Sequence, residues 1–475
     1  MDKPAKLLAI GVILAAAMMS ACGGSGAGTL SGIGPSGTMV VMGTDAPTLA
    51  NVVSFEVPIS GITVSGNGKT GVPIVDTPAT IDFSRLVGMQ ALIDIQPLAP
   101  GTYTSATITF GGNPTLSVLD TSSTPPAVTS INAVFSTMST TVNFSQPLNV
   151  GSSQALGLML DFRIGKSIPI DSSGNIVTSG TPPTVTVTPD IQLNILSPQQ
   201  AKFEIDDLRG GVQKINSDGS FVLQGPGGRQ FTVSTDSSTE WAPAGQSFAT
   251  LSTSDIVNVE EGIVDPAART VKAGEIDVFP DKFVLTGLVT YVSQSPSSGS
   301  ICAPTVDLLV RSALPGTTGS SYTEGQIGQV VLNGSENYWV GHKDWLGSQF
   351  NLGFGSCTLV PGQALTIGGT LDSSGNLTPK RVVLTIQGFS GTAQSGVAGD
   401  NTFQFSPQGL AGVLLPSPVT VQLIELPLFS TELEDLSGTN GIATGVKLHV
   451  AGLVLYNTTT NTTNILAGRV VAPTE

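Results

Sequence analysis

The stretch that decides the fold is Ser105-Ala106-Thr107-Ile108-Thr109-Phe110, in which Ala, Ile and Phe alternate with polar residues. A period of two places successive side chains on opposite faces of a strand, so this stretch predicts a β-strand with one buried face. The same alternation recurs in Thr184-Val185-Thr186-Val187-Thr188. Short runs rich in Val, Ile and Thr follow along the chain, separated by turn sequences such as Ser65-Gly66-Asn67-Gly68. Many short strands with turn-rich gaps are typical of sandwiches and small barrels, so we expect an all-β protein.

The composition favours a folded protein without a nucleic-acid partner. The 475 residues carry a net charge of −15, and charged residues make up 11% of the chain, where globular chains have about 25%. Lys and Arg number 19 and are scattered, whereas binding to phosphates needs clustered basic residues.

A helical period is hardly seen in the sequence, and the best short candidate for a helix is Phe83 to Gln90.

The N-terminus indicates a lipoprotein signal. An apolar run from Leu7 to Met19 follows two lysines; it is too short to span a bilayer but suits the core of a signal peptide. Met19-Ser20-Ala21-Cys22 resembles the bacterial lipobox. The resemblance implies cleavage of residues 1–21 and attachment of fatty acyl chains, such as palmitate, at Cys22. An ordinary signal peptide cut at Ala21 is the alternative.

Two further expectations follow from the lipid anchor. Gly23 after Cys22 implies, by the sorting rule of lipoproteins, a cell-envelope protein of the outer membrane where there is one. Residues 22–37 form a Gly/Ser tether with the composition of flexible coil. The two remaining cysteines, Cys302 and Cys357, are most simply a disulfide in an oxidising compartment.

Residues 38–200 resemble a family of bacterial envelope domains, domain-of-unknown-function family 4382. The matching motifs are an opening strand with a Thr-Asp-Ala-Pro turn, the strands that follow it, a Pro-Gly-Thr-Tyr strand start and an Asp-Phe…Ser-Ile strand: Thr38–Pro47, Phe55–Val64, Asp82–Leu86, Leu98–Thr104, Leu160–Ile168 and Thr188–Ile191. The resemblance implies an immunoglobulin- or transthyretin-like β-sandwich on a lipoprotein. The family has no established activity, so no site residue follows from it.

The remainder of the chain is internally repeated. Each unit contains a strand that ends at glycine, then a turn, then a closing strand. The two strands of each unit are Asp255–Gly262 with Thr270–Ile276, Pro361–Gly369 with Asn376–Val382, and Gly445–Gly452 with Ile465–Val470. Each unit has an earlier first strand, at Gly210–Val212, Thr286–Val289 and Ser390–Ala393. The pattern resembles domain-of-unknown-function family 5666 and implies small β-barrels of the oligonucleotide-binding (OB) type. We place the repeats at 201–282, 283–388 and 389–475; the third copy fits the pattern least well.

Two glycine-rich stretches imitate phosphate-binding motifs. Thr63–Thr70 is one residue from a P-loop, but a strand-like sequence follows it instead of a helix, which predicts a hairpin turn. Gly32–Gly37 fits G-x-G-x-x-G but belongs to the tether. No G-x-S-x-G elbow occurs in the sequence.

Acid–base and metal chemistry find little support in the sequence. Histidine occurs twice, and His449 lies inside an alternating strand as a surface or edge residue. The adjacent pairs Asp206-Asp207 and Glu260-Glu261 are expected to be solvated, because neighbours on a strand point to opposite faces. The turns at Asp171 and Asp372 lack the ligand series of a calcium loop. We predict no catalytic residue, no metal ligand and no cofactor.

One stretch, 337–345, gathers unusual side chains. It holds Tyr338, Trp339, His342 and Trp345 inside the longer segment 302–357. Exposed aromatic rings beside polar groups stack on sugars or anchor a protein partner. A small satellite core under a long loop, held by Cys302 and Cys357, is the alternative.

Three functions are therefore open. The first is a lipid-anchored, non-enzymatic binding or scaffold module of the cell envelope, with the membrane and another envelope protein as partners. The second is a surface glycan-binding protein that uses the 338–345 aromatic residues to bind polysaccharide. The third and weakest is a carboxylate-dependent hydrolase, which a deep pocket with two carboxylates of raised pKa would favour.

Overall fold

The computed structural model describes residues 36–44, 49, 51–172, 174–196, 203–206, 208–225, 228–299, 301–316, 318–342, 345–346, 352–426 and 429–472. Within these residues the fold is built from strands, and the two α-helices, α1 (Ile164–Ser167) and α2 (Gly409–Leu414), are short. The all-β prediction is confirmed. No helix among these residues is long and apolar enough to cross a membrane. The signal sequence, Cys22 and the tether as far as residue 35 lie outside the described residues.

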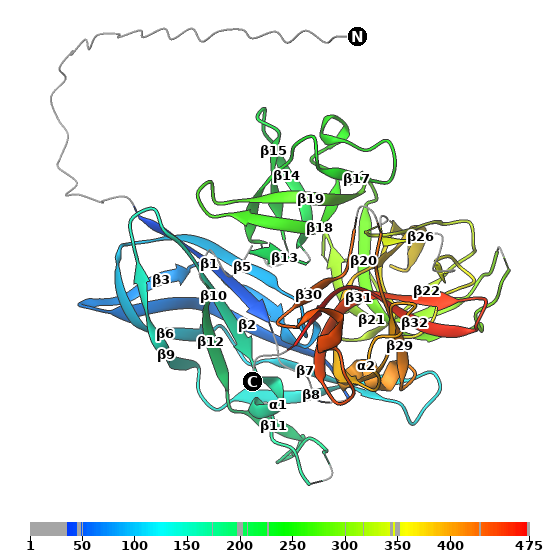
Figure 1. Cartoon of the computed structure of the whole chain (residues 1–475), viewed down its shortest axis with the longest axis horizontal. Coiled ribbons are helices and arrows are strands. Elements are labelled where there is room, and N and C mark those ends of the chain that lie inside the picture. The colour runs from blue at the N-terminus through cyan, green and yellow to red at the C-terminus, as the bar shows by residue number, and fades with distance from the viewer. Residues whose placement is uncertain are drawn as a thin grey trace, which may run out of the picture. The chain divides into compact units, whose positions relative to one another are not determined.

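The N-terminal part consists of two sheets that share one core (Figure 1). The four-stranded sheet has the order β12-β10-β1-β5: Ile191–Leu196, Ala155–Phe162, Gly37–Thr44 and Ala91–Leu98. The eight-stranded sheet has the order β11-β8-β7-β2-β6-β9: Thr184–Val187, Ala127–Phe135, Thr115–Asp120, Val52–Gly66, Gly101–Phe110 and Ser139–Val150. In this sheet β3 (Lys69–Val75) and β4 (Ala79–Asp82) pair with β2.

The alternating stretch 105–110 is the second half of β6. Its Ala106, Ile108 and Phe110 are buried in the shared core, whereas Thr107 and Thr109 are not. Across the core, the ring of Phe162 on β10 lies 5.3 Å from that of Phe55 on β2. The two sheets therefore pack face to face, as the period of two predicts. The short helix considered at 83–90 is only a 3-10 turn, Phe83–Arg85.

The first and third repeats are closed five-stranded barrels. The first contains β14 (Leu208–Ile215), β15 (Ser220–Gln224), β16 (Gln230–Ser234), β18 (Ile256–Asp265) and β19 (Thr270–Phe279). The third contains β27 (Gln387–Ala393), β28 (Thr402–Pro407), β29 (Val419–Leu423), β31 (Lys447–Asn457) and β32 (Thr462–Val471). In each, the third strand pairs in parallel with the fifth, and the fourth pairs with both the first and the fifth. This order is that of an OB-type barrel.

One glycine recurs at the same place in the first strand of every repeat. A Cβ atom on Gly210, Gly287 or Gly391 would lie 2.1, 2.7 or 2.2 Å from a carbonyl oxygen of the second strand. The two backbones approach so closely at this point, where the strand coils around the barrel, that only glycine fits. The third repeat shares this feature and the strand order, although its sequence pattern is the weakest.

The middle repeat has the same strand order, but its third and fifth strands are not joined by backbone hydrogen bonds. It contains β20 (Phe283–Val292), β21 (Thr305–Leu314), β22 (Ile327–Val331), β25 (Ala364–Leu371), β26 (Leu377–Thr385) and an added β23 (Asn337–Val340). The hydroxyl of Tyr322 bridges the gap, because it donates to the carbonyl of Gln329 on β22 and accepts from the N–H of Leu377 on β26. A side chain thus replaces the backbone pairing that closes the other two barrels.

Short additional strands extend each barrel, and one of them joins two repeats. The first and third barrels each carry an added strand parallel to the fifth, β17 (Glu240–Ala242) and β30 (Glu432–Glu434), just as β23 runs parallel to β26. Strand β13 (Glu204–Ile205) extends the first barrel. Strand β24 (Leu352–Gly353) comes from the long segment of the middle repeat but pairs with β31 of the third.

Candidate functional site

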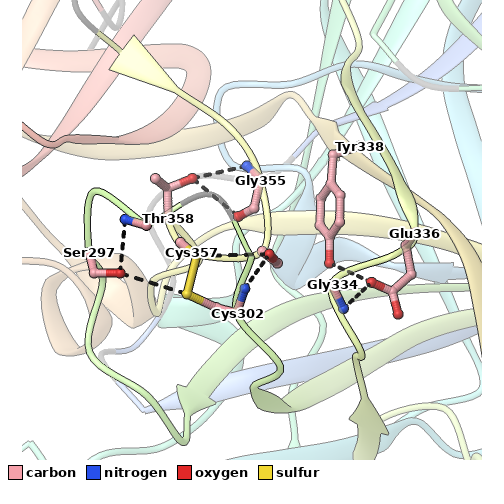
Figure 2. Close-up of a disulfide and its surroundings, with 10 residues drawn as sticks. Ser297, Cys302, Gly334, Glu336, Tyr338, Gly355, Cys357 and Thr358 are labelled. Atoms are coloured by element: carbon pink, nitrogen blue, oxygen red, sulfur yellow. Dashed lines mark hydrogen bonds between the residues drawn. A yellow bond between two sulfur atoms is a disulfide. The ribbon is translucent and has the colours of Figure 1, made fainter.

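The segment that carries the predicted aromatic residues begins at a disulfide. Cys302 and Cys357 are bonded, with their Cα atoms 5.0 Å apart, which confirms the predicted pairing (Figure 2). The backbone N–H of Cys302 donates to the hydroxyl of Ser356, and that of Ser297 donates to the carbonyl of Cys357. The disulfide therefore ties the start of β21 to the loop that precedes β25.

Tyr338 belongs to the same corner of the molecule. Its hydroxyl donates to the carboxylate of Glu336 at 3.0 Å, and that carboxylate also accepts the backbone N–H groups of Asn333 and Gly334 (Figure 2). Burial, and then the charge of Glu336, raise the pKa of Tyr338. The phenol therefore keeps its proton and helps to fix the turn before β23.

Trp339 points to the other side of β23 and contacts the first barrel. Its indole N–H donates to the carboxylate of Asp277 at 3.2 Å, and its ring stacks on Phe279, with 6.0 Å between ring centroids. Asp277 and Phe279 alternate along β19. Trp339 thus serves as a contact between the middle repeat and the first repeat.

His342 is the centre of a buried group of charged side chains. Its Nδ1 lies 2.8 Å from a carboxylate oxygen of Glu261, its Nε2 lies 3.6 Å from one of Glu260, and its backbone N–H donates to Glu275. The residue has a φ of 57° and a side chain that is 2% exposed. A left-handed backbone is uncommon for residues other than glycine, and histidine is one of those that adopt it more often.

A β-bulge explains why Glu260 is buried and not solvated. Val259 pairs with Ile276 and Glu261 pairs with Glu275, so Glu260 is an extra residue in β18. A bulge bends the strand and redirects a side chain. Glu260 accepts a hydrogen bond from the side-chain amide of Asn258, and its own side chain is 1% exposed, whereas Glu261 on the opposite face is half exposed. The expected solvation of this pair holds only for Glu261.

The electrostatics of this group favour bound protons. Burial raises the pKa of Glu275 to about 7 and that of Asp277 to about 6. Burial alone disfavours a charged imidazole, but the hydrogen bond and the charge of Glu261 raise the pKa of His342. The same hydrogen bond lowers the pKa of Glu261. His342 and Glu261 thus form an ion pair next to two carboxyl groups that titrate near neutral pH.

Trp345 fills the space between the middle and third repeats. Its ring stacks on His342 and on Phe429, with centroid distances of 4.4 and 5.0 Å. A Cβ atom on Gly468 would lie 1.9 Å from the tip of the indole. Trp345 also borders a cavity of ≈ 320 Å³ whose wall includes Glu260 and Arg469. The residue is 4% exposed, so protein covers most of its ring.

A group of three carboxylates lies next to this cavity, and two of them, Glu204 and Glu432, line it. Oxygen atoms of Glu204, Glu432 and Glu434 lie within 4.8 Å of one another, a spacing that a cation could bridge. Glu432 and Glu434 are on β30, and Arg469 approaches Glu204 at 4.0 Å. Such groups are common at protein surfaces without a metal ion, and nothing else at this place indicates a ligand.

A larger cavity of ≈ 970 Å³ lies where the N-terminal sheets meet the first two repeats. Two of its carboxyl groups have raised pKa values. Burial and the charges of Asp82 and Glu324 raise the pKa of Glu56 to about 7, and burial also raises that of Glu324. The sequence contains no signal for this pair, since the two residues lie in different domains.

The remaining sequence candidates are turns or strand residues. Thr63–Thr70 is the hairpin between β2 and β3, with Asn67 and Gly68 at positive φ. His449 on β31 is half-buried, its ring 2.7 Å from the hydroxyl of Ser390, and burial lowers its pKa. At Asp372 the carboxylate accepts N–H groups of its own turn. Gly32–Gly37 lies outside the described residues up to position 35.

Comparisons with known proteins add little to this picture. No protein-family model matches the chain, and no curated protein matches it. One similar solved structure is a deletion mutant of the single-stranded DNA-binding protein from Thermus aquaticus, with 15% identity over 41% of this chain and 94% of that chain, at a TM-score of 0.15. A similarity this low carries no argument about ligands. The assignment of the barrels rests on their strand order.

Proposed function

We propose that this protein is a lipid-anchored protein of the cell envelope that acts as a non-enzymatic binding or scaffold module. The lipobox-like sequence that ends at Cys22 supports the anchor. The disulfide between Cys302 and Cys357 agrees with an oxidising compartment outside the cytoplasm. Two or more acyl chains at Cys22 give stable membrane binding where a single chain does not.

The observation that carries the scaffold role is that the distinctive side chains join one repeat to the next. His342 pairs with Glu261 of the first barrel, and Trp345 stacks on Phe429 of the third. Side chains that are buried in such contacts fix the repeats relative to one another. They are then not free to bind a ligand, which favours the satellite-core interpretation of the 337–345 segment.

Glycan binding through this segment is the weaker proposal. Stacking on a sugar needs an accessible aromatic face. Trp345 is buried between protein groups, and Trp339 already stacks on Phe279. A glycan array with the mature protein tests this alternative beside a pull-down from envelope extract. Binding that is lost in a folded Trp339→Ala variant would replace the scaffold proposal.

A carboxylate-dependent hydrolase is a second candidate that one observation favours. Glu56 and Glu324 line the same large cavity, and both have raised pKa values. A raised pKa is what a general acid needs near neutral pH. Hydrolysis of chromogenic glycosides or esters that disappears in Glu56→Gln and persists in the exposed control Glu425→Gln would support an enzyme.

The anchor is tested by replacing Cys22. We expect Cys22→Ser to lose labelling by an alkynyl fatty acid and to leave the membrane fraction, because serine cannot form the thioether to the lipid. Ser25→Ala, three residues further along, is the matched control and stays labelled and membrane-bound. A Cys22→Ser protein that is still labelled and still membrane-bound would contradict the lipoprotein proposal.

A further inference from the structure

Half of the protein's arginines line one cavity. The chain contains eight arginines, and the walls of the ≈ 970 Å³ cavity include Arg85, Arg209, Arg229 and Arg311. The same lining includes the carboxylates of Glu56, Asp82 and Glu324, so the arginines exceed the carboxylates by one, in a chain with a net charge of −15. The volume lies within the range of about 300–1,000 Å³ that small-molecule sites occupy.

Each arginine reaches the cavity from a different element. Arg311 is the extra residue of a bulge in β21, because Val310 pairs with Gly287 and Ser312 pairs with Thr286. Its guanidinium donates to Asp82 at 2.6 Å and to the carbonyl of Val53. The others lie on the 3-10 turn after β4, on β14, and directly before β16. The cavity therefore forms only when three domains meet.

Some buried donors in the cavity wall have no hydrogen-bond partner among the described residues. Nε of Arg229 and the hydroxyl of Ser312 are among them. The other end of the Arg229 guanidinium is fixed, since its Nη1 donates to the carbonyl of Ile93 at 2.8 Å. A buried donor without an acceptor destabilises the folded protein. An acceptor from a ligand would remove that destabilisation.

Charges of both signs act on Arg229. Burial lowers its pKa, the charge of Asp94 raises it, and the smaller effect of Arg85 lowers it. Asp82, which also lines the cavity, is paired with Arg311. A negative ligand next to Arg85 and Arg229 would relieve the repulsion between these two guanidiniums.

We propose that this cavity binds a small organic anion with phosphate or carboxylate groups, which accepts hydrogen bonds from Arg229 and Ser312. Arginine suits this ligand because its planar fork of donors matches the oxygens of phosphate and carboxylate groups. Arg85 and Arg209 add positive charge to the wall. The site is independent of the lipid anchor, so it holds whether or not Cys22 is acylated.

Isothermal titration of the full chain with inorganic pyrophosphate and with citrate tests the site and separates the two ligand chemistries. We expect one of them to bind saturably at pH 6 and low salt, with one site per chain. Arg229→Gln should weaken binding about tenfold or more, because a hydrogen bond to a charged group is lost. Ser312→Ala, a smaller change that keeps the fold, should weaken it a few-fold.

The control is Arg269→Gln, which removes an exposed arginine from the β18–β19 turn and should bind as the unchanged protein does. Circular dichroism of each variant establishes that it is folded. Absence of saturable binding by both anions would overturn the proposal. So would binding that survives in folded Arg229→Gln and Ser312→Ala, since the anion would then sit on another surface.

The pH dependence gives a second readout. The pKa of Glu56 is about 7, and the groups that act on it are Asp82, Glu324, Arg311 and Ser54. Above pH 7 its carboxylate is charged and repels an anion in the same cavity. Both probe anions also lose protons in this range, so the readout is a comparison of two proteins: the ratio of the affinity at pH 8 to that at pH 6 should be higher in Glu56→Gln than in the unchanged protein. An unchanged pH dependence in Glu56→Gln would count against the placement of the anion in this cavity.

Discussion

The guanidinium of Arg469 in the last strand donates to the carboxylate of Asp206, 263 residues earlier, at 2.9 Å. Both side chains are almost completely buried, with 10% and 12% exposed. Arg469 also donates to the carbonyl of Gly88 in the N-terminal sheets. Arg469 belongs to the third repeat and thus contacts both the N-terminal sheets and the first repeat. It therefore links three parts of the described structure.

Replacing Arg469 should therefore destabilise the whole described fold. Arg469→Gln leaves the buried Asp206 without its cation, and breaking a buried pair costs about 3–5 kcal/mol. We expect a loss of this size in the free energy of unfolding, measured by urea denaturation with circular dichroism. Arg269→Gln on the surface should change it by less than about 0.5 kcal/mol. Equal effects of the two variants would show that the Arg469–Asp206 pair does not stabilise the contact between the repeats.

Stability should fall as the pH rises through neutrality. Glu275 has a pKa of about 7 in the folded protein against 4.5 for an unperturbed glutamate. Between these values the folded protein holds a proton that the unfolded chain has released, so the free energy of unfolding decreases with pH. The slope approaches about 1.4 kcal/mol per pH unit for each such proton. Asp277 and His342, whose pKa values are also raised, act in the same direction.

The variant Glu275→Gln isolates this contribution. The charged groups that act on Glu275 are His342, Asp277, Glu261 and Glu240. The amide cannot lose a proton, and its oxygen can still accept the N–H of His342, so the slope between pH 5 and pH 8 should decrease. Thermal unfolding of both proteins across this range measures the slopes. Parallel pH profiles would contradict the titration of Glu275 near pH 7.

The fold could be predicted from local patterns, because strands and turns are encoded locally. Three such patterns determine the backbone conformation where they occur. They are the alternation at 105–110, the Asn67-Gly68 hairpin turn and the glycine in the first strand of each repeat. The open middle barrel could not be predicted in this way. Its closure depends on a long-range contact of Tyr322 with Leu377, and no local pattern indicates that contact.

The candidate sites could also be predicted only as far as they depend on local sequence. The sequence identified 337–345 as unusual but could not show that Trp345 and His342 are buried, because burial depends on the neighbouring repeats. A bulge that alters the facing of Glu260 cannot be read from alternation. The arginine-lined cavity cannot be predicted from the sequence for the same reason. Its arginines are scattered along the chain and converge only in the folded protein.

Reduction of the disulfide should destabilise the middle repeat. Cys302 and Cys357 are 55 residues apart, and a cross-link that closes a loop of this length contributes about 4 kcal/mol through the unfolded state. We expect dithiothreitol to lower the melting temperature of the protein. The double variant Cys302→Ser/Cys357→Ser should melt at the lower temperature and not respond to dithiothreitol. An unchanged melting temperature of the reduced protein would show that the bond contributes little.

Trp345 and Gly468 should be energetically coupled, because the indole ring occupies the space that a side chain at position 468 would need. Gly468→Ala places a methyl group 1.9 Å from the indole, and such overpacking costs about 1–3 kcal/mol or more. Trp345→Ala costs about 3–5 kcal/mol through the cavity it leaves. In the double variant the new methyl group enters that cavity, so the combined loss should be smaller than the sum of the two. Urea denaturation followed by circular dichroism measures all four proteins, and Gly355→Ala, where a Cβ meets no atom within 4 Å, is the control. Strictly additive losses would mean that the indole does not lie against Gly468.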